Sequence, residues 1–156
     1  MVNREVVLSR ISKLDEYIKF LHEMGKYSKE EYLLDPLIYG STERFLHLSI
    51  ECVIDIANHI ISDMGYRKPN SNREIFEILF ENKIIDSDLK KSLSNMAGFR
   101  NILVHDYINL DREIVYDILN NNLKDMEDFR NIAIEYVWFG LARMIRFAPF
   151  YFLKEG

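Results

Sequence analysis

Apolar residues recur every three or four positions along most of the chain, which is the spacing of one face of an α-helix. In the first segment this spacing predicts a helix over residues 3–24. Asp35 followed by Pro36 has the form of a helix start, because a capping side chain precedes a proline in the first turn. A second long helix is therefore expected from there to Met64, with Gly65 as its stop.

The second half of the chain shows the same spacing. A capping box predicts a short helix over residues 71–82, and an aspartate cap opens a further helix over 86–107. The last helix is expected over 111–147, with a bend near Gly140. Because no segment alternates apolar and polar residues as a strand does, the sequence predicts an all-α fold, an up-and-down bundle of four to five helices.

Composition agrees with a bundle that buries a core. The chain has 156 residues, of which 48% are hydrophobic and 29% charged, so we expect one globular domain over residues 1–156. The chain has only three prolines and six glycines, so few residues interrupt its helices. The single cysteine, Cys52, has no partner for an internal disulfide and falls in an apolar run. We interpret it as a core residue of a cytoplasmic protein.

Charge and hydropathy limit the partners. A formal net charge of -5 argues against general nucleic-acid binding, so any such role must depend on a local site. The most apolar stretch is residues 137–152. It is shorter than the roughly 20 residues that cross a bilayer, and Arg143, Arg146 and Pro149 interrupt it. We expect it to pack into the core or a subunit interface, and we expect no membrane partner.

The stretch "GFRNILVHDYINL", residues 98–110, places polar side chains in an apolar helical pattern. If the helix continues to Tyr107, that residue and Arg100 share the apolar face, being seven positions apart. Asn101 and His105 share the adjacent side. Arg100 and His105 then point about 140° apart, so they converge only on something beside the helix, and a second subunit is the natural candidate.

Each of these residues also has a purely structural explanation. Arg100 on a buried face requires an ion pair, and Glu51 and Asp55 on the second long helix are available partners. His105 near a helix end is compatible with an ordinary surface histidine, and Tyr107 with the edge of a core. The combination favours a functional site more than any one residue does.

The segment "RNILVHDY", Arg100–Tyr107, resembles the R-x4-H-x-Y motif of the HEPN superfamily, specifically its HepT-like branch. Asn101 matches the polar residue that commonly follows the arginine in that superfamily. The stretch "FLHLSIECVIDIANHII", residues 45–61, is similar to the second helix of the branch. The resemblance covers about residues 1–138, which leaves an apolar C-terminal extension over 139–156.

This resemblance implies a fold, an activity and partners. HepT-like proteins are HEPN-like bundles of four or five helices that form homodimers. They act as metal-independent endoribonucleases, without a cofactor, and serve as the toxin of a type VII-like toxin–antitoxin pair. The antitoxin is a minimal nucleotidyltransferase that AMPylates the motif tyrosine, here Tyr107. The expected partners are therefore an RNA substrate, a second copy of the chain and this antitoxin.

The residue types suit RNA cleavage. Histidine titrates near neutral pH, so His105 is the candidate acid or base. Arg100 carries a permanent charge and can hold a phosphate through two parallel hydrogen bonds, which makes it the second candidate catalytic residue. Asn101 and Tyr107 are candidate supporting residues that orient the histidine or contact RNA. Glu51 and Asp55 are candidate ion-pair partners of the arginine. In a two-fold dimer each of these groups has a twin nearby.

Two other classes of function stay open. Five potential metal ligands follow one another at four-residue spacing on the second long helix, namely Glu43, His47, Glu51, Asp55 and His59. This row permits a metal-dependent helical-bundle enzyme, although the Glu-x-x-His pairs of dinuclear sites are missing from the sequence. A non-catalytic HEPN module that binds nucleotides or partners is the other alternative.

Overall fold

The computed structural model describes residues 4–145 of the chain. Part of the expected C-terminal extension, residues 146–156, lies outside the described residues. The described elements are α1 (Arg4–Met24), α2 (Lys29–Leu34), α3 (Pro36–Asp63), α4 (Asn72–Glu81), α5 (Ser87–His105), the 3₁₀ turn η1 (Tyr107–Asn109), α6 (Arg112–Asn121) and α7 (Leu123–Ile145).

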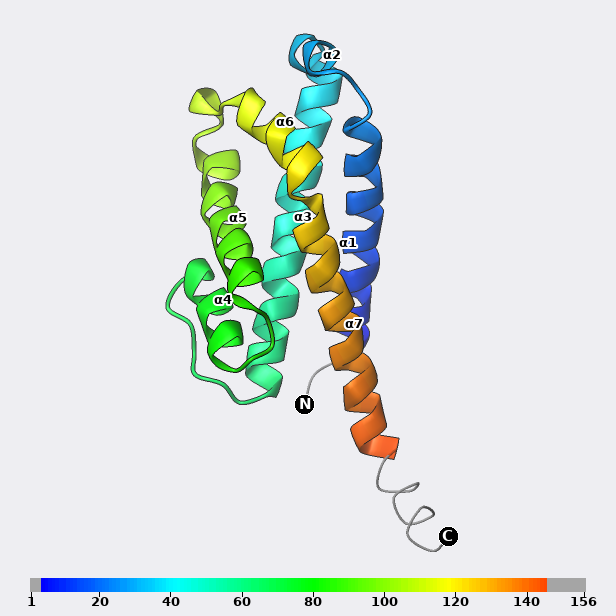
Figure 1. Cartoon of the computed structure of the whole chain (residues 1–156), viewed down its shortest axis with the longest axis vertical. Helices are drawn as coiled ribbons and strands as arrows, with labels where there is room; N and C mark the ends of the chain where they lie inside the picture. Colours follow the sequence, from blue (N-terminus) through cyan, green and yellow to red (C-terminus); the bar gives the residue numbers. More distant parts are fainter. Residues whose placement is uncertain (1–3, 146–156) are drawn as a thin grey trace, which may run out of the picture.

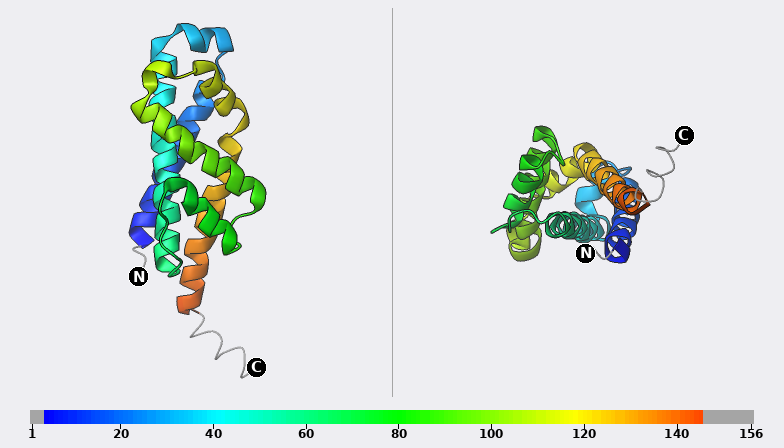
Figure 2. Two further views of the ribbon diagram at one scale, coloured as in Figure 1. Left: turned by 90° about the vertical axis from the view of Figure 1, so that its left-hand side faces the viewer. Right: turned by 90° about the horizontal axis from the view of Figure 1, so that it is seen from below.

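The four long helices α1, α3, α5 and α7 alternate in direction along the long axis of the molecule (Figure 1). The short helices α2 and α6 lie together with η1 at one end, and α4 lies beside the start of α5 at the other end (Figures 1 and 2). The described residues contain no strand. The prediction of an all-α, up-and-down bundle is therefore confirmed.

Helix α3 is the central element of the bundle, with α1, α4 and α5 packed against it. It is long and apolar enough to cross a bilayer by length and composition alone, but 56% of its most apolar window is buried inside the protein. We therefore interpret α3 as a core helix. Its buried apolar residues are Leu46, Ile50, Cys52, Val53, Ile54, Ile56, Ala57, Ile60 and Ile61.

Local capping explains why the helices begin where the sequence predicts. Asp35, Ser71 and Asp86 each accept a hydrogen bond from a backbone N–H in the first turn of the following helix, at distances between 2.8 and 3.2 Å. These bonds satisfy N–H groups that have no partner within the helix. The caps fix the starts of α3, α4 and α5, and with them the register of the site residues.

The prediction of one last helix over 111–147 is wrong. The chain leaves the helical conformation at Asn122, which separates α6 from α7. Asparagine amides compete for backbone hydrogen bonds, and Asn120 donates to the carbonyl of Tyr116 at 2.8 Å. Helix α7 then passes through Gly140 to Ile145, so the helix does not end at that glycine.

Tyr32 provides a test of how burial controls stability. Its side chain is fully buried, and its hydroxyl has no hydrogen-bond partner among the described residues. Because an unsatisfied buried hydroxyl costs about 1–3 kcal/mol, we expect Tyr32→Phe to raise the free energy of unfolding by about 1 kcal/mol. The ring, which lies 5.3 Å from that of Tyr116 between centroids, is kept.

Tyr116→Phe is the matched control for this prediction. The Tyr116 hydroxyl donates to the backbone carbonyl of Tyr27 at 3.0 Å, so the same change removes a bond that is made. We expect it to lower the free energy of unfolding by about 1 kcal/mol. Urea denaturation measures both variants, and effects of the same sign would contradict this account.

Candidate functional site

Helix α5 ends at His105, two residues earlier than the sequence pattern suggests. Asp106 adopts φ -129° and ψ 37°, and its carboxylate accepts a hydrogen bond from the Asn109 side chain at 2.8 Å. Tyr107 therefore begins the turn η1 and does not share the apolar face of α5. The expectation that it lies on that face is wrong, because 62% of Tyr107 is exposed.

Arg100 is anchored between two helices. Its Nε donates to Oε1 of Glu51 on α3, and its Nη1 donates to Oδ1 of Asn101 at 3.3 Å. The Arg100 and Glu51 side chains are 25% and 33% exposed, so water only partly screens their attraction. The ion pair predicted for Arg100 thus forms with Glu51, and the remaining N–H groups of the guanidinium have no protein partner within the described part of the chain.

The second candidate partner of Arg100 is engaged elsewhere. Asp55 pairs with Arg10 on α1, with 3.2 Å between Oδ2 and Nε. The expectation that Asp55 supports Arg100 directly is therefore wrong. The two carboxylates lie one turn of α3 apart. Glu51 pairs with an arginine on α5, whereas Asp55 pairs with an arginine on α1.

In the sequence, His47 stands out only as one of a row of potential metal ligands, and its contact with the ion pair of Arg100 is not evident. Its Nε2 lies 3.4 Å from the same Glu51 oxygen that Arg100 contacts. Its Nδ1 lies 3.3 Å from Nη1 of Arg44. The spacing of Arg44, His47 and Glu51 along one face of α3 is the signal that could have revealed this chain of contacts.

His105 lies apart from this anchored group. It is the last residue of α5, is exposed, and has no hydrogen-bond or ion-pair partner within residues 4–145. Because it follows Arg100 by five helical positions, the two side chains leave the helix about 140° apart. No hydrogen bond joins them in the described part of the protein. One subunit therefore presents an anchored arginine and a separate, accessible imidazole.

Exposed apolar side chains surround this end of α5. Ile108 is 82% exposed, and Ile102 and Tyr107 are also exposed. Leu110 is buried and ties the end of η1 to the core. Apolar exposure beside polar functional groups is typical of a surface that contacts another molecule.

Ion pairs occupy most of the four-residue row on α3. Glu43 pairs with Arg112 at 3.1 Å, while His47, Glu51 and Asp55 make the contacts described above. Burial raises the pKa of the Glu43 carboxyl, and the neighbouring Arg112 opposes that rise. Within the described residues, no three or more His, Cys, Asp or Glu side chains gather as a metal site would require. The row stabilises contacts between helices.

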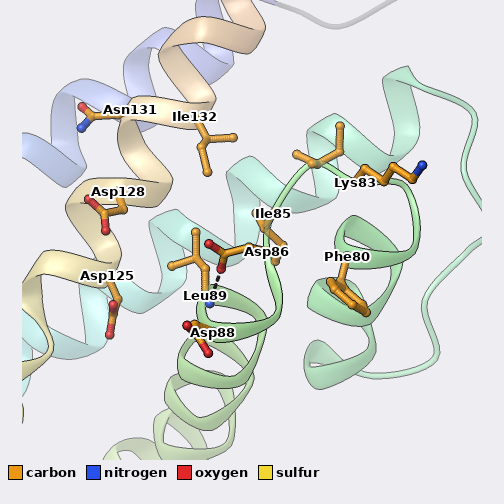
Figure 3. A pocket seen from close by; sticks show the side chains of 11 residues that line it. Phe80, Lys83, Ile85, Asp86, Asp88, Leu89, Asp125, Asp128, Asn131 and Ile132 are labelled. Atoms are coloured by element: carbon orange, nitrogen blue, oxygen red, sulfur yellow. Dashed lines mark hydrogen bonds between the residues drawn. The ribbon is translucent and has the colours of Figure 1, made fainter.

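A cavity of about 730 Å³ lies near the start of α5 (Figure 3). His105 is the last residue of that helix, so the cavity lies at the opposite end. Asp86 and Asp88 line it from the start of α5, and Asp125 and Asp128 face them from α7. One cation, Lys83, also lines the cavity, and Lys124 pairs with Asp128. The remaining carboxylates still outnumber the cation, so the cavity disfavours a polyanion. This cavity is therefore a poor site for a phosphate-containing ligand.

Known proteins that are similar to this chain belong to the family that the motif indicates. Residues 14–132 match the family described as Ribonuclease HepT-like. The chain is 30% identical over 131 residues to the mRNA nuclease HepT of Shewanella oneidensis, a match that covers 82% of this chain and 96% of that protein. It is 32% identical over 118 residues to the tRNA nuclease HepT of Aphanizomenon flos-aquae, covering 74% and 80%.

A solved structure gives the same result. The tri-AMPylated HEPN toxin of Shewanella oneidensis in complex with its MNT antitoxin superposes with a TM-score of 0.76 at 30% sequence identity. The match covers 85% of this chain and 97% of the toxin.

Proposed function

The chain belongs to the HepT-like ribonuclease family, and we propose that it is a metal-independent endoribonuclease whose active site is built around Arg100 and His105. The protein is a ribonuclease of the toxin class, as its relatives are. The single observation that supports the assignment of the site is that one intact R-x4-H-x-Y segment carries both an anchored Arg100 and an accessible His105.

The proposed reaction needs no external nucleophile. The 2′-oxygen of the RNA attacks the adjacent phosphorus, and the bond from phosphorus to the 5′-oxygen breaks. The proton of the 2′-hydroxyl passes to a base, and the departing 5′-oxygen receives a proton from an acid. We assign this proton transfer to His105, since imidazole performs both roles near neutral pH. The products are a 2′,3′-cyclic phosphate and a 5′-hydroxyl.

Arg100 supplies positive charge to the phosphate in the transition state. Glu51 holds its Nε, and Asn101 accepts from its Nη1, so the planar group is oriented before RNA arrives. A preoriented guanidinium stabilises developing charge without reorganising during the reaction. Asn101 and Glu51 therefore act as positioning residues in this proposal.

We further propose that the working form is a homodimer. Arg100 and His105 leave α5 in different directions, so a single subunit does not gather both on one phosphate. An isologous contact through the exposed apolar residues at the end of α5 brings the twin groups to one cleft. The exposed Ile102 and Ile108 are candidates for that contact.

The antitoxin is the second proposed partner. We propose that a minimal nucleotidyltransferase modifies Tyr107, which is the exposed tyrosine of the motif. A cytoplasmic location is proposed as well. It is consistent with a buried free cysteine, Cys52, and with the core position of α3. No cofactor or membrane enters this mechanism.

The function is tested with purified protein, freed of antitoxin, and RNA in EDTA. We expect cleavage in EDTA, and Glu51→Ala should lower kcat by about ten- to a hundredfold because it releases the guanidinium of Arg100. Asp55→Ala is the matched control, since it removes a carboxylate one turn away that pairs with Arg10. It should leave kcat nearly unchanged.

Three results would count against this account. Equal loss in the Glu51 and Asp55 variants would mean that the anchor is only structural. Cleavage that requires added divalent metal would favour a metal-dependent enzyme. A stably folded protein that cuts no RNA would favour a non-catalytic binding module.

A further inference from the structure

A second polar surface lies between α4 and α5, away from the motif. It is a groove of about 530 Å³. Its lining residues include Arg73 from α4 and Ser87, Lys91, Ser94 and Asn95 from α5. The Ser94 hydroxyl is covered by protein yet has no hydrogen-bond partner within the described residues. The groove therefore holds three cations, of which Lys90 is the third, and at least one hydroxyl that lacks a partner.

The acidic residues of this groove are already neutralised. Glu74 pairs with Arg67, and Glu77 lies 3.5 Å from Lys90 between charged atoms. Within the described part of the chain, Arg73 and Lys91 have no carboxylate partner. Although the protein as a whole is acidic, the net charge available to a ligand in the groove is positive.

The position of Arg73 links the groove to α5. Its Nη2 lies 3.4 Å from Oδ1 of Asn95, and its Cζ would lie 3.8 Å from a Cβ at Gly98. Gly98 has no side chain, so the guanidinium rests close to the α5 backbone. It stands between the groove and the motif segment that begins at Arg100.

One face of α5 continues from the groove to the candidate active site. Its residues are spaced alternately by four and three positions, which keeps them on one side of a helix. They are Ser87, Lys91, Ser94, Gly98, Asn101 and His105. None of them is an apolar side chain, and the last is the proposed acid or base. We call this face the polar stripe of α5.

We propose that the groove between α4 and α5 binds the phosphodiester backbone of the RNA substrate beyond the cleaved bond, with Arg73 and Lys91 as its phosphate contacts. This inference rests on the proposed ribonuclease function and extends it from the reacting phosphate to its neighbours. The RNA strand lies along the polar stripe of α5, from His105 towards the groove.

The charges on the two sides of α5 favour a path of the RNA towards the groove. Asp88, one turn before Lys91, lines the acidic cavity instead of the groove. That cavity repels the strand on the other side of α5, so the groove is the favourable side. Phosphate contacts of this kind are independent of base sequence. The site therefore binds single-stranded RNA generally and leaves sequence selection to the cleft.

The test compares two double variants. Arg73→Ala with Lys91→Ala removes the two groove cations that have no carboxylate partner in the described part of the chain. Lys19→Ala with Lys68→Ala removes two exposed cations elsewhere that also have no such partner there, and gives the same net charge. The probe is a fluorescein-labelled single-stranded RNA dodecamer carrying 2′-O-methyl groups throughout, which blocks cleavage. Fluorescence anisotropy measures Kd as a function of salt.

We expect the groove variant to raise Kd about tenfold at low salt and to lower the slope of log affinity against log salt by about 1.4, as two lost single-strand phosphate contacts require. The control should bind as the wild type does. Equal weakening in both variants would show an effect of bulk charge and overturn the proposal. No weakening in the groove variant, or no binding by the wild type, would also overturn it.

Cleavage assays separate this inference from the proposed function. On a cleavable dodecamer, the groove variant should raise KM and keep kcat. On a dinucleotide, which does not reach the groove, it should match the wild type. A wild type that cuts neither substrate contradicts the ribonuclease function, whereas the uncleavable probe still decides the groove. Equal KM values on the dodecamer for the groove variant and wild type would overturn the inference alone.

Discussion

Replacement of His105 by alanine is expected to reduce RNA cleavage by about a hundredfold to ten-thousandfold, because it removes the group assigned to proton transfer. His105 is exposed and makes no hydrogen bond to the rest of the described chain, so the change should leave folding and assembly intact. Single-turnover cleavage of a labelled RNA in EDTA measures the loss. His22→Ala, an exposed histidine on α1, is the control and should retain full activity.

Arg100 is expected to show a loss of similar size for a different reason. Arg100→Ala removes the charge that stabilises the transition state, which is worth about a hundredfold to a thousandfold. It also leaves the partly buried Glu51 without its arginine partner. Arg100→Lys keeps the charge and the ion pair but loses the planar fork, so it should fold normally and still be strongly impaired.

Two controls make the Arg100 result decisive. Arg10→Ala removes the arginine that pairs with Asp55, and it should leave cleavage unchanged. Sedimentation should show the proposed dimer for every variant. If the Arg100→Lys variant and the His105→Ala variant both kept full activity, the assignment of this site would be refuted.

The second large effect concerns control by the antitoxin. Incubation with the cognate nucleotidyltransferase, ATP and magnesium is expected to add AMP to Tyr107 and to suppress RNA cleavage. The hydroxyl oxygen of the tyrosine would bond to the α-phosphorus of ATP, and pyrophosphate would leave. The product carries a negative phosphodiester two residues from His105, where it competes with RNA for positive charge.

Tyr107→Phe keeps the ring and removes the acceptor oxygen. It should fold, resist modification and stay active in the presence of the antitoxin. Tyr27→Phe is the matched control, since Tyr27 is also exposed but lies far from the motif in the sequence. Intact-mass measurement shows whether AMP has been added to each variant. Equal labelling of wild type and Tyr107→Phe would rule out this mechanism of control without affecting the ribonuclease function.

Helix starts were predictable from sequence because capping is local. Asp35, Ser71 and Asp86 bond to N–H groups two or three residues away, so a short window contains the signal. Helix ends were less predictable. Side-chain hydrogen bonds compete with helical ones at two of these ends, from Asn109 to Asp106 after α5 and from Asn120 to the carbonyl of Tyr116 before the break at Asn122. The apolar pattern does not show this competition.

The candidate site, too, was only partly predictable from the sequence. Sequence spacing indicated that Arg100 needed a carboxylate and offered Glu51 and Asp55, but the selection depends on how α1, α3 and α5 pack. The groove is a further example. Arg73 and Lys91 are 18 positions apart in sequence, and only the packing of α4 against α5 brings them to one surface.

The predictions about RNA cleavage depend on the proposal that this chain cleaves RNA by internal transfer at Arg100 and His105 without a metal. The most direct measurement is mass spectrometry of the ends produced when purified protein cuts a defined single-stranded RNA in EDTA. We expect 2′,3′-cyclic phosphate and 5′-hydroxyl ends, which His105→Ala should no longer produce. Ends that carry a 3′-hydroxyl and a 5′-phosphate, formed only after divalent metal is restored, would contradict it.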